Sequence, residues 1–257
     1  MTGALLDVAL LEERRSTLGA GAALWAGPDG VAVSDDRWVA LSGAPSVEYN
    51  AALVHGDGDA LDNTVAEVLA AGVPTVVMVA GRATREVARL RARRWKPIGS
   101  TALMHLDLGS QPVRPPAHAA RRLGPDDHPA VKKLVGDVFG VGPDLAAVAF
   151  SGVSANRDGH ALRGAFNRDG RLMSCLATAR VGETVTVWSM ATARQARGRG
   201  YGAAALRSAL ASAADKGATS SLLSSSAAGE PLYRRLGYRE LERWQQWSRP
   251  RWVLARA

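Results

Sequence analysis

The chain has 257 residues with 47% hydrophobic content, enough to bury a substantial core in one large or two small domains. Its net charge of +8 raises nucleic acid as a partner, but the arginines are scattered and the run at 91–94 is expected on a solvated helix face, so specific nucleic-acid binding is disfavoured. The lone Cys175 excludes an internal disulfide and a cysteine-based zinc cage, and no stretch resembles a signal peptide or membrane span, so we expect a cytoplasmic protein without a metal.

Hydrophobic patterning in the first half predicts a helix, three short strands and then a strand–helix–strand–helix–strand series. The expected helices lie at 3–17, 62–71 and 82–94, and the expected strands at 22–26, 37–41, 49–54, 75–79 and 100–106. The proline-rich stretch 108–116 is expected to be an extended linker. We therefore predict a first unit at 1–110 and a linker at 111–121.

The second half, at 122–257, shows a similar order of elements. The expected helices lie at 128–139, 144–150, about 202–215 and 231–236, and the expected strands at 162–167, 172–180, 184–190, 220–225 and 238–248. Gly56 and Gly58 of the first half align with Gly200 and Gly202 of the second, which indicates an internal repeat. Asp57 and Asp59 stand beside the first pair of glycines, where a carboxylate would repel a phosphate. We predict that only the second copy binds an anionic ligand.

The stretch from Thr184 to Leu206 is typical of a strand, a glycine-rich loop and a helix, an arrangement that binds phosphate through backbone amides. A P-loop is excluded, because the sequence has no Lys-Ser or Lys-Thr pair. A dinucleotide fingerprint would need an acidic residue about 20 positions after the loop. This place is taken by Leu222, Leu223 and Ser224, so a dinucleotide-binding site is disfavoured.

Two segments resemble the GCN5-related N-acetyltransferase (GNAT) family. The loop from Gln195 to Gly202 is similar to the family's pyrophosphate loop, and Pro231–Tyr238 resembles its L-Y-x-x-x-G-F/Y element. The resemblance implies an α/β (α+β) fold of two tandem GNAT-like domains, each a mixed, mainly antiparallel sheet flanked by helices. The N-terminal copy would be degenerate and structural, whereas the C-terminal copy would use acetyl-CoA or another acyl-CoA and no metal.

The resemblance also implies site residues. Backbone groups of Met190, Ala191 and Thr192 would pair with the pantetheine arm, and Tyr233 would protonate the leaving thiolate. Ser226 stands where many members have an Asn that contacts pantetheine, so its contact has a shorter reach. The cofactor-binding loop is assigned to Gln195, Ala196, Arg197, Gly198, Arg199, Gly200, Tyr201 and Gly202.

Other candidate residues give weaker signals. Glu183 and Glu230 are the candidates for a general base, although both fit a solvated surface. Cys175 lies in an apolar strand and is expected to be a small buried residue. The acceptor is an unidentified small-molecule or peptide amine, and a polycationic one would need an acidic cleft, which Asp57 and Asp59 could supply. The alternative is a non-catalytic acyl-CoA-binding or regulatory module.

Overall fold

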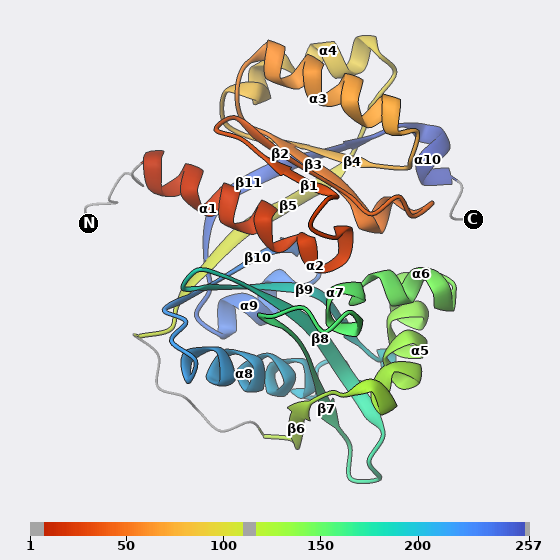
Figure 1. The fold of residues 1–257 in the computed structure, drawn as a ribbon, viewed down its shortest axis with the longest axis vertical. Coiled ribbons are helices and arrows are strands. Elements are labelled where there is room, and N and C mark those ends of the chain that lie inside the picture. Colours follow the sequence, from red (N-terminus) through yellow and green to blue (C-terminus); the bar gives the residue numbers. More distant parts are fainter. Residues whose placement is uncertain (1–7, 110–116, 255–257) are drawn as a thin grey trace.

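Eleven strands pair into one continuous mixed sheet in the computed structural model, which describes residues 8–109 and 117–254 (Figure 1). The strands are β1 Val31–Val33, β2 Arg37–Leu41, β3 Asn50–Val54, β4 Val76–Val79, β5 Lys96–Asp107, β6 Ala120–Arg122, β7 His160–Phe166, β8 Leu172–Val181, β9 Thr184–Thr192, β10 Ser220–Ser226 and β11 Arg239–Ser248. Their order across the sheet is β1-β2-β3-β4-β11-β5-β10-β9-β8-β7-β6.

The order of the central strands shows that the two halves share this sheet. β5, the last strand of the first half, pairs antiparallel with β10 of the second half, while β11 pairs antiparallel with β4 of the first half. β5 and β11 also pair with each other. The prediction of a separate sheet in each half is therefore wrong. The exchange gives both long strands a partner on each edge, so no unpaired edge is left between the halves.

The helices follow the expected positions with several differences. The helices are α1 Val8–Gly21, α2 Ala23–Ala26, α3 Gly58–Ala71, α4 Val87–Ala92, α5 His128–Phe139, α6 Pro143–Val148, α7 Ser151–Ser154, α8 Tyr201–Ala214, α9 Glu230–Arg235 and α10 Pro250–Leu254. The strand expected at 22–26 is wrong, because this short apolar segment forms α2. The helix expected at 82–94 is split into a 3-10 helix at Gly81–Glu86 and α4. β1, β6, α7 and α10 were not anticipated.

The predicted linker falls partly on residues 110–116, which lie outside the described residues. The proposed domain limits therefore stay a prediction. Within 8–109 and 117–254, no helix is long and apolar enough to cross a membrane.

Three clusters of buried side chains hold the layers together. One cluster spans both halves on a single face of the sheet and includes Leu18, Trp38, Leu53, Phe150 and Leu222. On the other face, a second cluster lies under α3 and α4, and a third lies under α8 and α9. Figure 1 shows α3 and α4 at one end of the molecule and α8 toward the other. Burial of this apolar surface is the main favourable contribution to folding.

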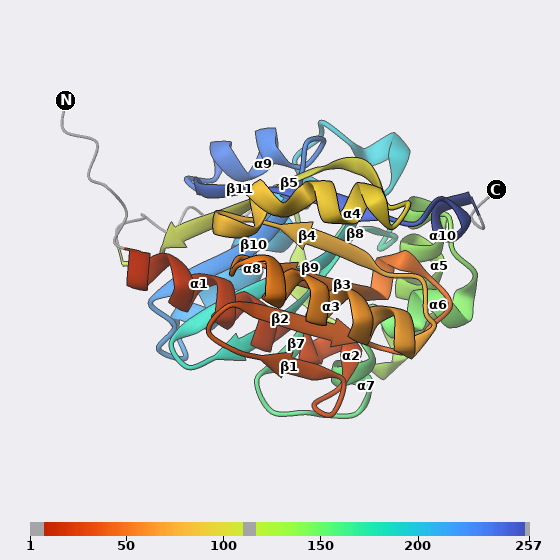
Figure 2. The ribbon, with the colours of Figure 1, turned by 90° about the horizontal axis from the view of Figure 1, so that it is seen from above.

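Helix α1 contacts strands of both halves, and two of its glycines let it pack closely. A Cβ on Gly19 would lie 2.5 Å from the Trp38 ring on β2, and a Cβ on Gly21 would lie 2.2 Å from Thr186 Oγ1 on β9. Figure 2 shows α1 beside β1 and β2, with α2 near α7. Because one helix is fitted against strands of both halves, it fixes their relative position at this face.

Candidate active site

Strands β9 and β10 run side by side only over their first residues. Their parallel register begins at Thr184 with Ser220 and ends at Val187 with Leu223. Ser189, with φ of 49°, follows this point, and the register of β9 against β8 shifts at the same place. A bulge of this kind bends a strand and redirects its side chains. The two strands therefore separate beyond Val187 and leave a gap in the sheet.

The glycine-rich loop comes directly after β9 and leads into α8. Gly198 and Gly200 have φ of 73° and 87°, a left-handed conformation that residues with a Cβ rarely adopt. Gly200 is the N-cap of α8, and no side chain caps this helix. An uncapped helix N-terminus attracts anions through its unpaired amides and its dipole. The loop therefore has the backbone geometry of an anion site.

A cleft of about 810 Å³ connects this loop with the gap between β9 and β10 and with α9. Most residues that the sequence predicts for the site line this cleft. They are Met190, Thr192, Ala196, Arg197, Gly198, Gly200, Gly202, Ser226 and Tyr233. Gly202 allows α8 to approach β9 here, since a Cβ at this position would lie 3.0 Å from Met190 Cε and 3.2 Å from Thr192 Oγ1.

Four predicted residues do not line the cleft. The side chain of Ala191 is buried, and its carbonyl accepts a hydrogen bond from Ser174 Oγ at 2.9 Å, on the β8 side of the strand. Gln195 lines another cavity, beside α5. Arg199 and Tyr201 lie against His118 instead. The His118 Nε2–H group donates to the Arg199 carbonyl at 2.7 Å, and the imidazole of His118 stacks on the ring of Tyr201 with centroids 3.9 Å apart.

His118 contacts the glycine-rich loop, and nothing in the sequence indicates this role. Four strands, β6 to β9, separate His118 from Arg199 and Tyr201 along the chain, so only the fold brings them together. A hydrogen bond to the carbonyl of Arg199 and a stack on Tyr201 restrain both residues that flank Gly200. His118 therefore helps to fix the conformation of the glycine loop.

Tyr233 brings a phenol to the cleft from α9. Its side chain is 8% exposed, and its hydroxyl donates to Met190 Sδ at 3.3 Å. The ring packs edge-on against Tyr238 with centroids 5.7 Å apart. Burial raises the pKa of Tyr233 to about 12, because the charged phenolate would lose its hydration. The hydroxyl is therefore protonated at neutral pH and can donate a proton within the cleft.

The two carboxylates considered as general bases lie elsewhere. Glu183 is exposed in the turn between β8 and β9, at the end of β9 opposite the loop. Glu230 is bound by Arg243 through contacts of 2.9 and 3.0 Å, and this guanidinium lowers the pKa of the Glu230 carboxyl. Neither residue lines the cleft, and no described Asp, Glu or His does.

Cys175 is buried in β8, and burial raises the pKa of its thiol to about 12. A thiol with so little thiolate character at neutral pH is a poor nucleophile. The prediction of a small buried residue is therefore confirmed. In the described part of the chain, no group of three His, Cys, Asp or Glu side chains could hold a metal ion.

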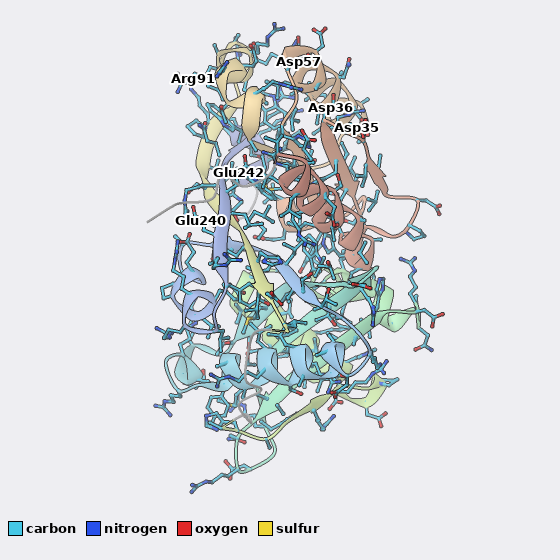
Figure 3. The ribbon with its side chains drawn as sticks, turned by 90° about the vertical axis from the view of Figure 1, so that its left-hand side faces the viewer. Asp35, Asp36, Asp57, Arg91, Glu240 and Glu242 are labelled. Atoms are coloured by element: carbon cyan, nitrogen blue, oxygen red, sulfur yellow. The ribbon has the colours of Figure 1, made fainter. Side chains whose placement is uncertain are left out.

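Helix α3 of the first half is capped by its own chain. Asp57 is its N-cap, and the Asp57 carboxylate accepts hydrogen bonds of 3.2 Å from the amides of Asp59 and Ala60. The Arg89 guanidinium packs on Gly58, so that a Cβ there would lie 2.8 Å from it. Two amides at the N-terminus of α3 are thus occupied by a carboxylate, whereas no side chain caps α8 (Asp57 is labelled in Figure 3).

Replacing Asp57 with Ala removes this cap, and we expect the free energy of unfolding to fall by about 1 kcal/mol. Asp59→Ala is the matched control, because the Asp59 side chain does not cap α3, and it should change stability by less than half as much. Urea denaturation of the three proteins measures both values. Equal losses in the two variants would contradict a capping role for Asp57.

Comparison with known proteins identifies the fold. Residues 164–240 match the model of the acetyltransferase (GNAT) domain family. The solved GCN5-related N-acetyltransferase from Kribbella flavida superposes with a TM-score of 0.63 at 18% identity, over 91% of this chain and 96% of that one. A GCN5-related N-acetyltransferase from Sphaerobacter thermophilus gives 0.60 at 19% identity, over 86% and 78%.

A tandem GNAT protein from the clavulanic acid biosynthesis pathway gives a TM-score of 0.54 at 14% identity, over 83% of this chain and 78% of that one. No curated protein sequence matches the chain significantly. The family match at 164–240 covers β8, β9, the glycine loop, α8, β10 and α9, which are the elements that build the cleft. Residues 164–240 are therefore similar to the acetyltransferase (GNAT) domain family, and the chain shares its fold with solved GNAT structures.

Proposed function

We propose that the protein is an N-acetyltransferase that transfers an acetyl or other acyl group from acyl-CoA directly to an amine within a ternary complex. The observation that carries this proposal is the cleft itself, which joins an uncapped glycine loop to a buried, protonated phenol at a gap in the sheet. The glycine loop is suited to the pyrophosphate of the coenzyme, and the phenol of Tyr233 is suited to the thioester end.

Successive parts of the cleft would bind successive parts of the coenzyme. The amides of the loop from Arg197 to Gly202, with the guanidinium of Arg197, would bind the pyrophosphate. The edge of β9 beyond Val187 would pair with the pantetheine arm, because β10 has separated from it. The hydroxyl of Ser226, which is exposed at the end of β10, would reach the same arm.

The transfer step would then proceed without a covalent enzyme intermediate. The lone pair of the neutral amine attacks the thioester carbonyl, the C–N bond forms, and the C–S bond breaks. The thiolate takes the proton of the Tyr233 hydroxyl, and the nitrogen loses its extra proton, which restores the phenol through solvent. The products are the amide and free coenzyme A, so atoms and charge balance.

We further propose that the first half is a second GNAT-like copy that does not bind coenzyme. The series β3-α3-β4-α4-β5 has the same order as β9-α8-β10-α9-β11, and in both the first two strands are parallel. One similar solved structure is described as a tandem GNAT protein. The carboxylate of Asp57, seated on the amides of α3, supports loss of the anion site in this copy.

Isothermal titration calorimetry with acetyl-CoA tests the cofactor. We expect one site per chain, and at least about tenfold weaker binding for Gly200→Glu, because a carboxylate would face the pyrophosphate. Gly170→Glu is the matched control, since Gly170 also has positive φ, at 76°, but lies in an open turn between β7 and β8. Absence of wild-type binding would refute the cofactor, and two sites per chain would refute the inactive first copy.

A further inference from the structure

A cavity of about 240 Å³ lies beside the C-terminal half of α8, away from the glycine loop that precedes this helix. Its other walls come from strands β6 to β9 and from the loop between α7 and β7. Figure 1 shows α8 next to β6 and β7 in this part of the molecule. No described residue lines both this cavity and the cleft, so the two spaces are separate.

Basic side chains give this space, the basic cavity, its charge. The basic residues that line it are Arg122, Arg157, Arg163, Arg180 and Lys216, and among the described lining residues the one acid is the exposed Asp158. Within residues 8–109 and 117–254, none of these six residues forms an ion pair. A recess lined mainly by one sign of charge attracts ions of the opposite sign. The basic cavity therefore favours an anion.

Two of these arginines lie directly opposite each other on neighbouring strands. Arg122 of β6 is the register partner of Arg163 of β7 in an antiparallel pair. Side chains in such positions stand on the same face with Cβ atoms about 5 Å apart, and like charges there repel each other. Arg163 is half-buried, and burial, followed by the charge of Arg122, lowers the pKa of the Arg163 guanidinium. An anion between the two guanidinium groups would offset this repulsion.

The neighbouring arginine of β6 is neutralised by the protein itself. Arg121 lies on the opposite face of the strand from Arg122, because successive side chains alternate. Its guanidinium donates two hydrogen bonds to the carboxylate of Asp127, at 2.7 and 2.8 Å, and this contact lowers the pKa of Asp127. In the described part of the chain, Arg122 and Arg163 have no such carboxylate. A bound anion would take its place.

The other two arginines of the basic cavity are held by backbone carbonyls. Arg180 of β8 donates to the carbonyls of Lys216 and Gly217, the latter at 3.0 Å, just after the end of α8. These contacts offset the negative end of the helix dipole, which would otherwise oppose an anion here. Arg157 donates to the carbonyl of Ala23 at 3.1 Å. The arginines on β6 and β7 are therefore the guanidinium groups best placed to bind a ligand.

We infer that the basic cavity binds a phosphate group between Arg122 and Arg163, as free inorganic phosphate or as the phosphate of a small ester. Each guanidinium presents planar, paired N–H donors that match phosphate oxygens, and two guanidinium groups balance the charge of one phosphate dianion. The volume lies below the range usual for drug-sized ligands, so the rest of an ester would lie outside the cavity. Phosphate bound here would be distinct from the pyrophosphate of a coenzyme, which the glycine loop would hold.

Equilibrium dialysis with radiolabelled inorganic phosphate tests this site. The parent protein is Gly200→Glu, whose carboxylate would repel phosphate from the glycine loop and leave the basic cavity to bind it. We expect one phosphate per chain, and a Kd raised about tenfold or more by Arg163→Gln in this background, because the substitution removes a charged pair of donors. Arg122→Gln, on the edge strand β6, should weaken binding in the same way.

Arg168→Gln is the matched control for these variants. Arg168 is exposed in the turn between β7 and β8 and does not line the basic cavity, so this change removes one positive charge and should keep Kd within about twofold. Competition with glucose 6-phosphate distinguishes the two sources of phosphate. Displacement of the label at about tenfold lower concentration than unlabelled phosphate would identify an ester as the ligand, and the reverse would identify the free ion.

Thermal unfolding gives a second readout that does not depend on Gly200→Glu. Because Arg122 and Arg163 repel each other, Arg122→Gln should not lower Tm in phosphate-free buffer. Phosphate, compared with chloride at the same ionic strength, should raise the Tm of the wild type more than that of this variant. Equal Kd values for Arg163→Gln, Arg122→Gln and the parent protein would overturn the inference. Binding abolished by sodium chloride at about 0.15 M would also overturn it, since nonspecific attraction between exposed charges is screened in this way.

Discussion

Replacing Tyr233 with Phe should lower kcat about a hundredfold or more and leave the Kd for acetyl-CoA within about twofold. Among the described residues that line the cleft, Tyr233 is the one with a phenol, and burial raises the pKa of this phenol to about 12. Phe keeps the ring, and so it keeps the packing against Tyr238 and the buried volume of α9. Only the proton and the contact with Met190 Sδ are lost.

Tyr238→Phe is the matched control for Tyr233→Phe. Tyr238 is also a buried phenol, and its hydroxyl pairs with Ser221 Oγ at 2.7 Å, but it does not line the cleft. We expect this variant to lose about 1 kcal/mol of stability and to keep its kcat. If Tyr233→Phe retains kcat within about threefold, the thiolate leaves without this acid. If the wild type binds acetyl-CoA but turns over no amine, the non-catalytic module is the better reading.

The pH dependence of kcat gives a further check on the same residue. A pKa raised to about 12 means that the Tyr233 hydroxyl stays protonated as the pH rises to that value. Tyr233 should therefore produce no alkaline loss of activity between pH 7 and 10. An alkaline limb in that range that disappears in Tyr233→Phe would show that the phenol ionises in the cleft and would contradict the assigned role.

The order of strand, loop and helix around the glycines could be predicted because its determinants are local. β-branched residues favour β9, and Gly198 and Gly200 permit the positive φ values that turn the chain into α8. The element containing Tyr233 follows in the same half of the chain. Short connections and one hydrophobic face are enough to place this element beside the loop. A single stretch of sequence therefore indicates most of the cleft.

The shared sheet could not be predicted, because the pairing of β5 with β10 and of β11 with β4 joins the two halves. The alternation of apolar residues in β5 fits either neighbour equally well, so the pattern identifies a strand and not its partner. The prediction of a strand at 22–26 is wrong for another reason. A short apolar run has no clear period, and this segment forms helix α2. Because of both errors, the sequence does not predict a cavity of about 260 Å³ beside the gap in the sheet. The walls of this cavity include residues of α1, α2, β2 and the turn at Glu48.

Replacing Arg15 with Leu should lower the free energy of unfolding by about 3 kcal/mol, because it leaves a largely enclosed carboxylate, with a side chain 16% exposed, without its cation. Arg15 on α1 is 5% exposed and binds Glu242 of β11 through two contacts, of 2.9 and 2.6 Å. Glu242 also accepts hydrogen bonds from Trp244 Nε1 at 2.7 Å and from the Gly81 amide at 3.3 Å. Figure 3 labels Glu242 on β11, where the register against β5 shifts between Glu240 and Glu242.

The pair should show strong coupling in a double-mutant cycle. Arg15→Leu combined with Glu242→Gln removes both charges while Gln can still accept the hydrogen bond from Trp244, so we expect the double variant to be more stable than Arg15→Leu alone. Lys133→Gln is the control, because the pair of Lys133 with Asp137 is exposed on α5, and it should change stability by less than about 0.5 kcal/mol. A loss below about 1 kcal/mol in Arg15→Leu would contradict the assigned role.

The ion pair of Arg15 with Glu242 lies close to His55. Burial, with Arg15 nearby, lowers the pKa of His55 to about 4, so the imidazole is neutral at pH 7 and Arg15 is the cation that faces Glu242. The ion pair joins α1 to β11. Helix α1 also supplies Leu18 to the wall of the cavity of about 260 Å³ and packs Gly19 against Trp38, which lines the same cavity. Arg15→Leu should therefore leave acetyl-CoA binding within about twofold of the wild type at a temperature where the variant remains folded, because every described residue that lines the cleft comes from the second half. A loss of acetyl-CoA binding of about tenfold in the folded variant would show that the ion pair also supports the cleft.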